Sequence, residues 1–192
     1  MKSFILDGSS PDDPVAININ RCLLKLLEPD GASVTRVALA GQDIKGCIGC
    51  LNCFFKTPGK CHFDDIAREL PHHYVDSDLA VFITPVTFGG FSSVFARAYN
   101  RMMIQLESHL VETINGELLR KKRYGRAHPA VMVIGMEKEP DPDAEGVFTA
   151  LVSSNAMLHL RAPKHSVAYV ASDFSESDIA RTISESLAFV RS

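Results

Sequence analysis

Short apolar runs alternate with amphipathic segments along this chain. The runs at 79–84 and 130–134 are continuously apolar and rich in β-branched residues, as strands buried on both faces of a parallel sheet are. Apolar residues also recur at helical spacing from Val15 to Leu26. The whole pattern predicts strands at 3–7, 33–39, 79–84, 130–134 and 166–171, and helices at about 15–26, 66–70, 92–109, 147–160 and 176–190.

This alternation indicates a doubly wound α/β sheet, because parallel strands need crossover helices between them. Such sheets bind ligands beyond the carboxyl ends of their strands, where the strand order reverses. The loops at that edge are expected at 8–14, 41–65, 85–91 and 135–146. We expect residues 1–192 to form one domain, since the chain shows no internal repeat and no linker.

Composition and charge exclude several function classes. A formal net charge of −3 argues against nucleic acid as the main partner, and Arg120–Arg123, the only basic run, is expected in a solvated loop. No apolar run is long enough to span a membrane, and no signal peptide precedes the first strand. We therefore expect a cytoplasmic protein, whose cysteines serve metal or redox chemistry rather than a disulfide framework.

Four of the five cysteines fall between positions 47 and 61. Cys47, Cys50 and Cys53 are three residues apart, so one short loop or helical turn can direct their sulfurs to a common centre. Cys61 would return to that centre across a Pro58-Gly59 turn. Cys22 lies on the apolar face of the first helix and is expected in the core.

Three interpretations of the cysteine stretch stay open on spacing alone. A [4Fe–4S] cluster suits a C-x2-C-x2-C triplet with a more distant fourth cysteine. Zinc suits it less well, because structural zinc sites usually pair two separated C-x2-C knuckles. The third interpretation is a set of reduced thiols, or one disulfide, without a metal.

Four features together resemble a known family. They are a first strand followed by Gly-Ser, the loop Gly46–Cys53, a cysteine followed by Asp64-Asp65, and a strand that ends in Thr84-Pro85-Val86. Over residues 1 to about 105 the chain is similar to the flavodoxin-like NAD(P)H-dependent FMN reductases, and more narrowly to the branch that includes the iron–sulfur flavoproteins. The resemblance implies a five-stranded parallel sheet in the order 2-1-3-4-5, FMN at the strand ends, and a homodimer or homotetramer.

By position, the resemblance also implies which residues bind the cofactors. Ser9 and Ser10 would lie near the FMN phosphate, and Gly135 and Met136 would cover one side of the flavin. The residues that would run along the isoalloxazine ring are Pro85, Val86, Thr87, Phe88, Gly89 and Gly90. The cluster ligands would be Cys47, Cys50, Cys53 and Cys61.

Two departures from the family bear on FMN. The first loop carries Asp12 and Asp13, where relatives place basic and small polar residues that hold the phosphate. Either Ser10 and Asp13 form a capping box, or Asp13 caps a helix that starts at Pro14; in both cases the helix amides gain protein partners. The second departure is Thr87, where relatives often carry an aromatic residue that packs on the flavin.

The leading functional hypothesis is an FMN-dependent oxidoreductase that takes electrons from NAD(P)H. It would pass them, through a cluster if one is present, to a small-molecule or protein acceptor. The flavin supplies this chemistry, so no acid–base residue is expected. The alternative is a flavodoxin-fold protein that has lost FMN and keeps the cysteines as a metal-binding or redox-sensing site. A third hypothesis is a dimerisation domain whose cysteines are relics.

Overall fold

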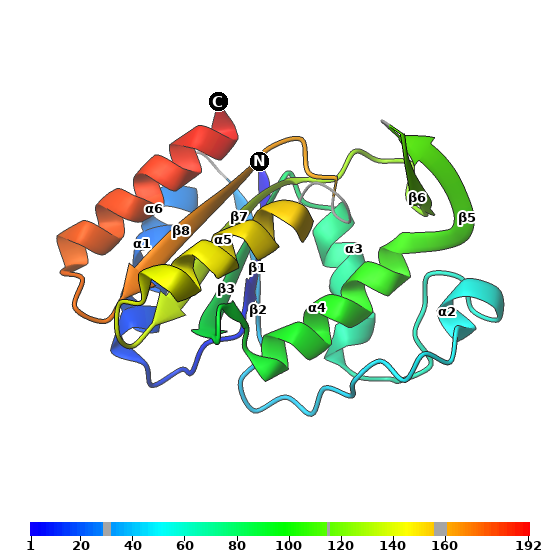
Figure 1. Ribbon diagram of the computed structural model, residues 1–192, viewed down its shortest axis with the longest axis horizontal. Coiled ribbons are helices and arrows are strands. Elements are labelled where there is room, and N and C mark those ends of the chain that lie inside the picture. The colour runs from blue at the N-terminus through cyan, green and yellow to red at the C-terminus, as the bar shows by residue number, and fades with distance from the viewer. Residues whose placement is uncertain (29–31, 115, 156–160) are drawn as a thin grey trace.

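Five parallel strands form the central sheet of the computed structural model, which describes residues 1–28, 32–114, 116–155 and 161–192 (Figure 1). The strand order is β2-β1-β3-β7-β8, so the first strand lies between the second and the third, and the order reverses at β1. This confirms the predicted doubly wound, flavodoxin-like arrangement. The strands are β1 (Lys2–Asp7), β2 (Ser33–Ala38), β3 (Leu79–Thr87), β7 (Ala130–Glu137) and β8 (His165–Ala171).

Helices cover both faces of the sheet, which explains why its central strands are apolar throughout. Val81 and its neighbours Ile5 and Met132 pack with α1 and α6 on one face, whereas Phe82 packs with α3, α4 and α5 on the other. These helices are α1 (Pro14–Leu27), α3 (Leu70–Val75), α4 (Ser93–Leu106), α5 (Pro142–Asn155) and α6 (Glu176–Arg191). None of the described helices is both long and apolar enough to cross a membrane.

Side-chain caps define where two helices begin. The Asp13 carboxylate accepts hydrogen bonds from the backbone N–H groups of Val15 and Ala16, so the second of the two predicted capping schemes is the one observed. At α6, Ser175 and Asp178 form a capping box. Pro29-Asp30-Gly31, a sequence that predicts the end of the first helix, lies outside the described residues.

The largest error of the sequence analysis lies between α4 and β7. The helix predicted to reach His109 ends at Leu106, and β5 (Glu107–Ile114) and β6 (Glu117–Lys122) form an antiparallel hairpin. Most of the basic run therefore lies in a strand, not in a solvated loop. The hairpin forms because the β-branched residues Val111, Thr113 and Ile114 precede a turn at Gly116, whose φ of 85° suits glycine.

Smaller errors concern the element ends. β3 and β7 run three residues beyond their predicted ends, because their pairing continues to Pro85 and Met136 and β3 then turns back into β4 (Gly90–Phe91). The segment 66–75 forms a 3-10 turn and α3, with Tyr74 buried, rather than a helix followed by a polar stretch. The helix predicted at 147–160 begins at Pro142, and 156–160 lie outside the described residues.

Candidate functional site

A cleft of about 1260 Å³ opens at the carboxyl ends of β3 and β7. The start of α1 forms one wall, the end of β3 forms another, and the loop between β7 and α5 closes the cleft on the remaining side. Its lining residues are Ser10, Asp13, Pro14, Val15, Pro85, Val86, Thr87, Met136, Glu137, Lys138, Glu139, Pro140, Asp141, Pro142 and Ser172.

Half of the residues predicted for the flavin site line this cleft: Ser10, Pro85, Val86, Thr87 and Met136. Ser9 does not, because its N–H and hydroxyl both donate to the buried carboxylate of Asp7. Gly135 lies beneath the cleft, where an added Cβ would stand 2.6 Å from Phe148 and 2.9 Å from Val86.

The other three predicted residues do not line the cleft: Phe88 and Gly89 form the turn between β3 and β4, and Gly90 is the first residue of β4. Phe88 and Gly89 have φ values of 52° and 71°, as the two central residues of a type I′ turn do. The Phe88 side chain is fully exposed. Gly89 has no room for a side chain, since a Cβ would stand 2.8 Å from Val147.

Asp7, which the sequence analysis missed, organises the floor of the first loop. Its side chain is 1% exposed and accepts hydrogen bonds from Arg36 Nη2 (2.6 Å) and Asn20 Nδ2 (2.9 Å) as well as from Ser9. This network joins the end of β1 to α1 and β2. An aspartate at the end of an apolar strand was the feature that could have revealed it.

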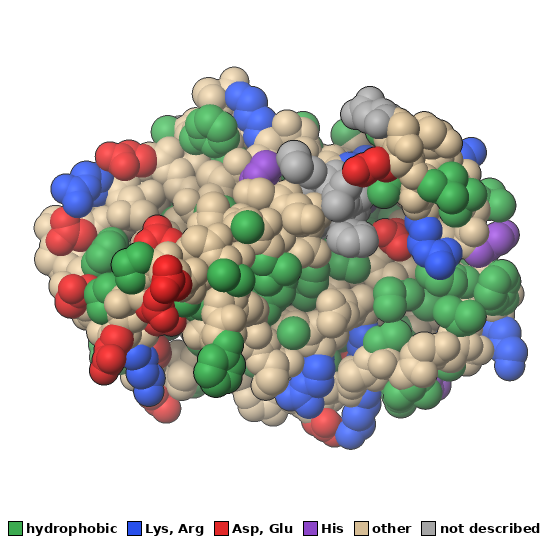
Figure 2. Space-filling model, viewed as in Figure 1, with side chains coloured by type: hydrophobic (Ala, Val, Ile, Leu, Met, Phe, Trp, Pro, Cys, Tyr) green, Lys and Arg blue, Asp and Glu red, His purple; other side chains and the backbone are tan. Residues whose placement is uncertain are grey.

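Carboxylates dominate the charge of the cleft. Four of its lining residues are acidic (Asp13, Glu137, Glu139, Asp141) and one is basic (Lys138), which gives a formal charge of −3. Burial, together with the nearby Asp141 carboxylate, raises the pKa of Glu137. Figure 2 shows acidic side chains gathered at this end of the molecule, near the start of α5.

The four clustered cysteines meet in a second pocket of about 240 Å³. Cys53 lies in α2 (Asn52–Phe55), and Gly49 and Leu51 bend the preceding backbone with left-handed φ values of 67° and 57°. All five cysteines of the chain are free thiols. The pocket residues used below are Cys47, Cys50, Cys53, Cys61, His62, Phe63, Ile104 and Arg120.

The thiols of this pocket influence one another. Burial raises the pKa of Cys53, and the neighbouring thiols of Cys61, Cys47 and Cys50 raise it further. The Nδ1 atom of His62 lies 3.5 Å from the Cys50 sulfur. Among the described residues, no three Cys, His, Asp or Glu side chains are arranged to hold a single metal ion.

Two polar side chains on α4 and one that follows β6 hold the cysteine loop in place. The Arg101 side chain, 1% exposed, pairs with Asp65 and donates to the carbonyl of Lys45 (3.1 Å). Gln105 accepts a hydrogen bond from the backbone N–H of Cys61 (2.9 Å). Arg123, just after β6, donates to the Cys53 carbonyl (3.0 Å). The sequence analysis did not assign these roles, because each partner lies between 36 and 70 residues away along the chain.

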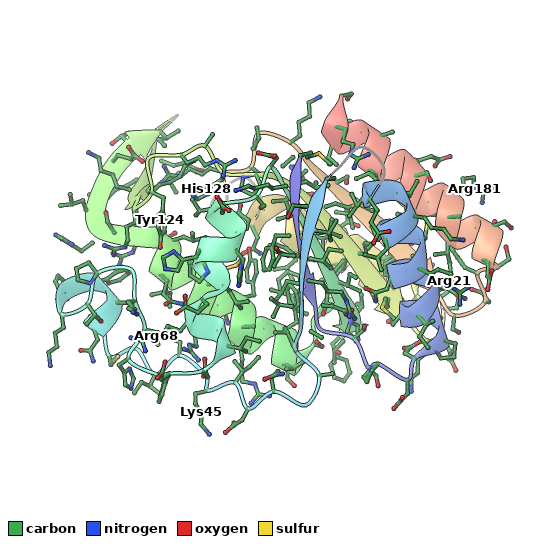
Figure 3. The ribbon with its side chains drawn as sticks, turned by 180° about the vertical axis from the view of Figure 1, so that it is seen from behind. Arg21, Lys45, Arg68, Tyr124, His128 and Arg181 are labelled. Carbon is green, nitrogen blue, oxygen red and sulfur yellow. The ribbon has the colours of Figure 1, made fainter. Side chains whose placement is uncertain are left out.

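The cysteine pocket and the cleft share no lining residue, although the cysteine segment begins at the carboxyl-end edge of the sheet, as predicted. The chain leaves that edge after β2 and carries α2 to the opposite end of the longest axis (Figure 1). Figure 3 shows the same separation from behind, with Arg68 and Tyr124 on the side of α2, and Arg21 and Arg181 on α1 and α6. The cause is the contact of α2 with α4 and β5.

The sequence model of the family described as NADPH-dependent FMN reductase matches residues 1–136. The chain belongs to this family. An iron–sulfur flavoprotein of Methanocaldococcus jannaschii is 29% identical over 93 residues, which are 48% of this chain and 47% of that protein. The match thus spans about half the length of this curated relative.

Solved structures show how widely the fold of this FMN reductase family member is shared. An NAD(P)H:quinone oxidoreductase from Methanothermobacter marburgensis has a TM-score of 0.67 at 11% identity, over 100% of this chain and 96% of that one. An azoreductase from Bacillus anthracis has a TM-score of 0.66 at 13% identity, over 99% and 98%. An FMN-dependent NADH-azoreductase from the same species, in complex with FMN, has a TM-score of 0.64 at 11% identity, over 99% and 98%. At these identities the likeness shows the fold alone.

One end of the cleft suits FMN, the family's cofactor, and the other end does not. Pro85, Val86 and Met136 offer an apolar wall on which a flavin ring can pack. At the other end, the first amides of α1 bond to Asp13 rather than facing the cleft. The residues present therefore fit the ring of FMN and do not fit its phosphate.

Proposed function

We propose that this chain is a flavin-dependent oxidoreductase that takes electrons from NAD(P)H. The observation that carries the proposal is the cleft at the switch in strand order, with Pro85–Thr87 and Met136 along it, in a member of the FMN reductase family. The chemistry that a bound flavin supplies there is hydride acceptance from NAD(P)H and electron donation to an acceptor.

The chain's own part in this function is to position the ring and shield it from water. Pro85, Val86 and Met136 provide the apolar contact surface, and Gly135 lets Phe148 and Val86 close up beneath it. We assign no acid–base residue, because hydride transfer to a flavin requires none from the protein.

We further propose that Cys47, Cys50, Cys53 and Cys61 hold a [4Fe–4S] cluster that passes single electrons to a small-molecule or protein acceptor. In support, the four thiols line one pocket, and Gln105 and Arg123 fix the backbone at Cys61 and Cys53. The partial match to an iron–sulfur flavoprotein supports the same assignment. Cluster binding would require the four thiols to deprotonate, which the iron itself favours.

We also propose that the chain forms a homodimer or homotetramer. Exposed apolar side chains gather around the cysteine pocket and the hairpin, at the right of Figure 2. Ile48, Phe55, Leu110 and Leu118 are each more than half exposed there. An apolar surface of this kind usually marks a protein interface.

The test of the proposed function is purification without oxygen, followed by a visible absorption spectrum and assays for iron and acid-labile sulfide on the same sample. Flavin bands, a broad iron–sulfur shoulder, and oxidation of NADH or NADPH are expected. Cys50→Ser should lose iron, whereas Cys22→Ala, which changes a thiol packed against the α1–α6 core, should retain it. A sample without iron that still shows flavin bands would refute the cluster only.

One observation favours the alternative, a flavodoxin-fold protein without flavin. It is the Asp13 cap, which removes the anion-binding amides from the cleft. A colourless protein that binds no added flavin, yet still binds metal through its cysteines, would establish this alternative and overturn the leading proposal.

A further inference from the structure

The start of α1 has no N–H group to offer to an anion. Pro14 lacks an N–H, Val15 N and Ala16 N lie 2.9 and 3.5 Å from Asp13 Oδ1, and Ile17 N bonds to the Asp13 carbonyl at 3.0 Å. Helix N-termini bind phosphate through free amides of this first turn. Here the Asp13 carboxylate takes the position that a phosphate would occupy.

A second segment adds acidic residues to the cleft. Glu137, the last residue of β7, and Glu139 and Asp141 on the loop that follows line the cleft with Asp13, and Lys138 supplies one positive charge. A phosphate that is nearly dianionic at pH 7 would meet net negative charge from both walls. Hydroxyl groups, in contrast, donate hydrogen bonds, and carboxylates are acceptors.

We propose that this cleft selects a flavin without a terminal phosphate, so that riboflavin binds more tightly than FMN. The neutral polyol tail of riboflavin can donate to Asp13 and to the carboxylates opposite, whereas the FMN phosphate is repelled. The inference rests on the proposed function, because it assumes that the isoalloxazine ring lies against Pro85, Val86 and Met136.

The experiment measures the Kd of riboflavin and of FMN for the flavin-free full-length chain, by quenching of flavin fluorescence. We expect a riboflavin Kd at least about tenfold lower than that of FMN, the ratio that one modest charge repulsion produces. Raising the salt concentration should tighten FMN binding by screening the repulsion and leave riboflavin unchanged. A cleft built for phosphate would show the opposite salt dependence.

Two substitutions separate the charge of Asp13 from its role as a cap. Asp13→Asn keeps a side chain that caps helices equally well but removes the charge, so FMN should bind about tenfold more tightly and riboflavin within about twofold of before. Asp12→Asn removes the same charge from an exposed turn outside the cleft lining and should change neither Kd by more than about twofold. Circular dichroism verifies that both variants are folded.

The possible failures can be told apart. If the unmodified chain binds FMN more tightly than riboflavin, the inference is overturned while the proposed function gains support. If Asp13→Asn leaves the ratio of the two Kd values unchanged, the role given to Asp13 is overturned. Binding of neither flavin would overturn the proposed function itself, and the inference with it.

Discussion

Replacing Arg101 by methionine should loosen the whole cysteine segment, because this one guanidinium ties both ends of the segment to α4. Arg101 pairs with Asp65 at the far end and donates to the Lys45 carbonyl at the near end, and also reaches the Phe63 carbonyl at 3.4 Å. Methionine keeps most of the aliphatic volume. The substitution therefore removes charge rather than packing volume, and it leaves the Asp65 carboxylate, which is 13% exposed, without its ion-pair partner.

The surroundings of Asp65 determine how much free energy of unfolding Arg101→Met removes. Breaking a buried ion pair costs about 3–5 kcal/mol, mostly because one charge stays behind unpaired. Asp65 keeps its hydrogen bonds from the backbone N–H groups of Lys45 and Ala67, both at 3.1 Å, so we expect the lower figure, about 3 kcal/mol. Asp65→Asn combined with Arg101→Met should recover part of it, with a coupling free energy of about 2 kcal/mol.

The assay is urea unfolding of the metal-free protein, monitored by circular dichroism and accompanied by titration of accessible thiols. Arg101→Met should lower the free energy of unfolding and speed the reaction of the clustered thiols, because the cysteine segment loses its anchors at Lys45 and Asp65. Arg97→Met, on an exposed position of the same helix, is the control and should change stability by less than about 0.5 kcal/mol. A coupling below about 0.5 kcal/mol would refute the assignment of the ion pair as the clamp.

The same pair should make the protein sensitive to acid. Burial alone would raise the pKa of Asp65, but the hydrogen bond from Arg101 and those from the backbone of Lys45 and Ala67 outweigh it, and the pKa is lowered. The stabilisation is therefore complete above the ordinary aspartate pKa of about 4 and is lost as the pH falls through the lower, folded value. Arg101→Met should lose less stability than the parent protein between pH 5 and pH 2.

Three further predictions concern other positions. Gly135→Ala should lower the free energy of unfolding, measured by thermal denaturation, by about 1–3 kcal/mol, because the added Cβ would overlap Phe148 and Val86. Gly146→Ala, in α5 with open space around it, should raise it by roughly 0.4–1 kcal/mol. An equal effect of the two substitutions would contradict the packing described beneath the cleft. Alkylation of the metal-free protein at pH 8, followed by mass spectrometry, should label Cys53 more slowly than Cys47. Burial and the neighbouring thiols raise the pKa of Cys53, and the thiolate is the reactive form. Equal labelling rates would contradict the raised pKa of Cys53. Phe88→Asn should raise the free energy of unfolding by about 1 kcal/mol, because asparagine tolerates a φ of 52° better and the fully exposed ring is lost without cost. A fall in stability would show that Phe88 makes contacts in solution.

The sheet could be predicted from the sequence because the residue patterns that define its strands and helices are local. Continuous apolar runs such as 79–84 mark strands buried on both faces, and the helical spacing from Val15 to Leu26 marks the crossover after β1. The Asp13 cap is also local, since it needs only Pro14 and the next two amides. For that reason the sequence alone predicts that the acidic first loop caps α1.

The hairpin and the site geometry depend on distant contacts, and the sequence analysis missed them. The Glu107–Ile114 strand follows α4 without a loop, so helical spacing appeared to continue through it. Spacing alone groups the cysteines, but it cannot show where their pocket lies, because its anchors Arg101 and Gln105 are on α4, 36 and 44 residues from their partners. The family resemblance assigned Phe88, Gly89 and Gly90 to the flavin, but β3 continues to Thr87 and these residues lead back into β4, outside the cleft lining.

The attachment of the cysteine segment has a consequence for how such proteins can diversify. In the part of the chain that the structure describes, neither core cluster contains a residue between Ile44 and Ile66. The segment is held by polar bonds from α4 and from Arg123 and by the buried side chain of Phe54, which lies outside both core clusters, so mutation can change the segment without disturbing the packing of the sheet. Evolution can therefore change the cysteine segment while the sheet and its cleft are inherited unchanged.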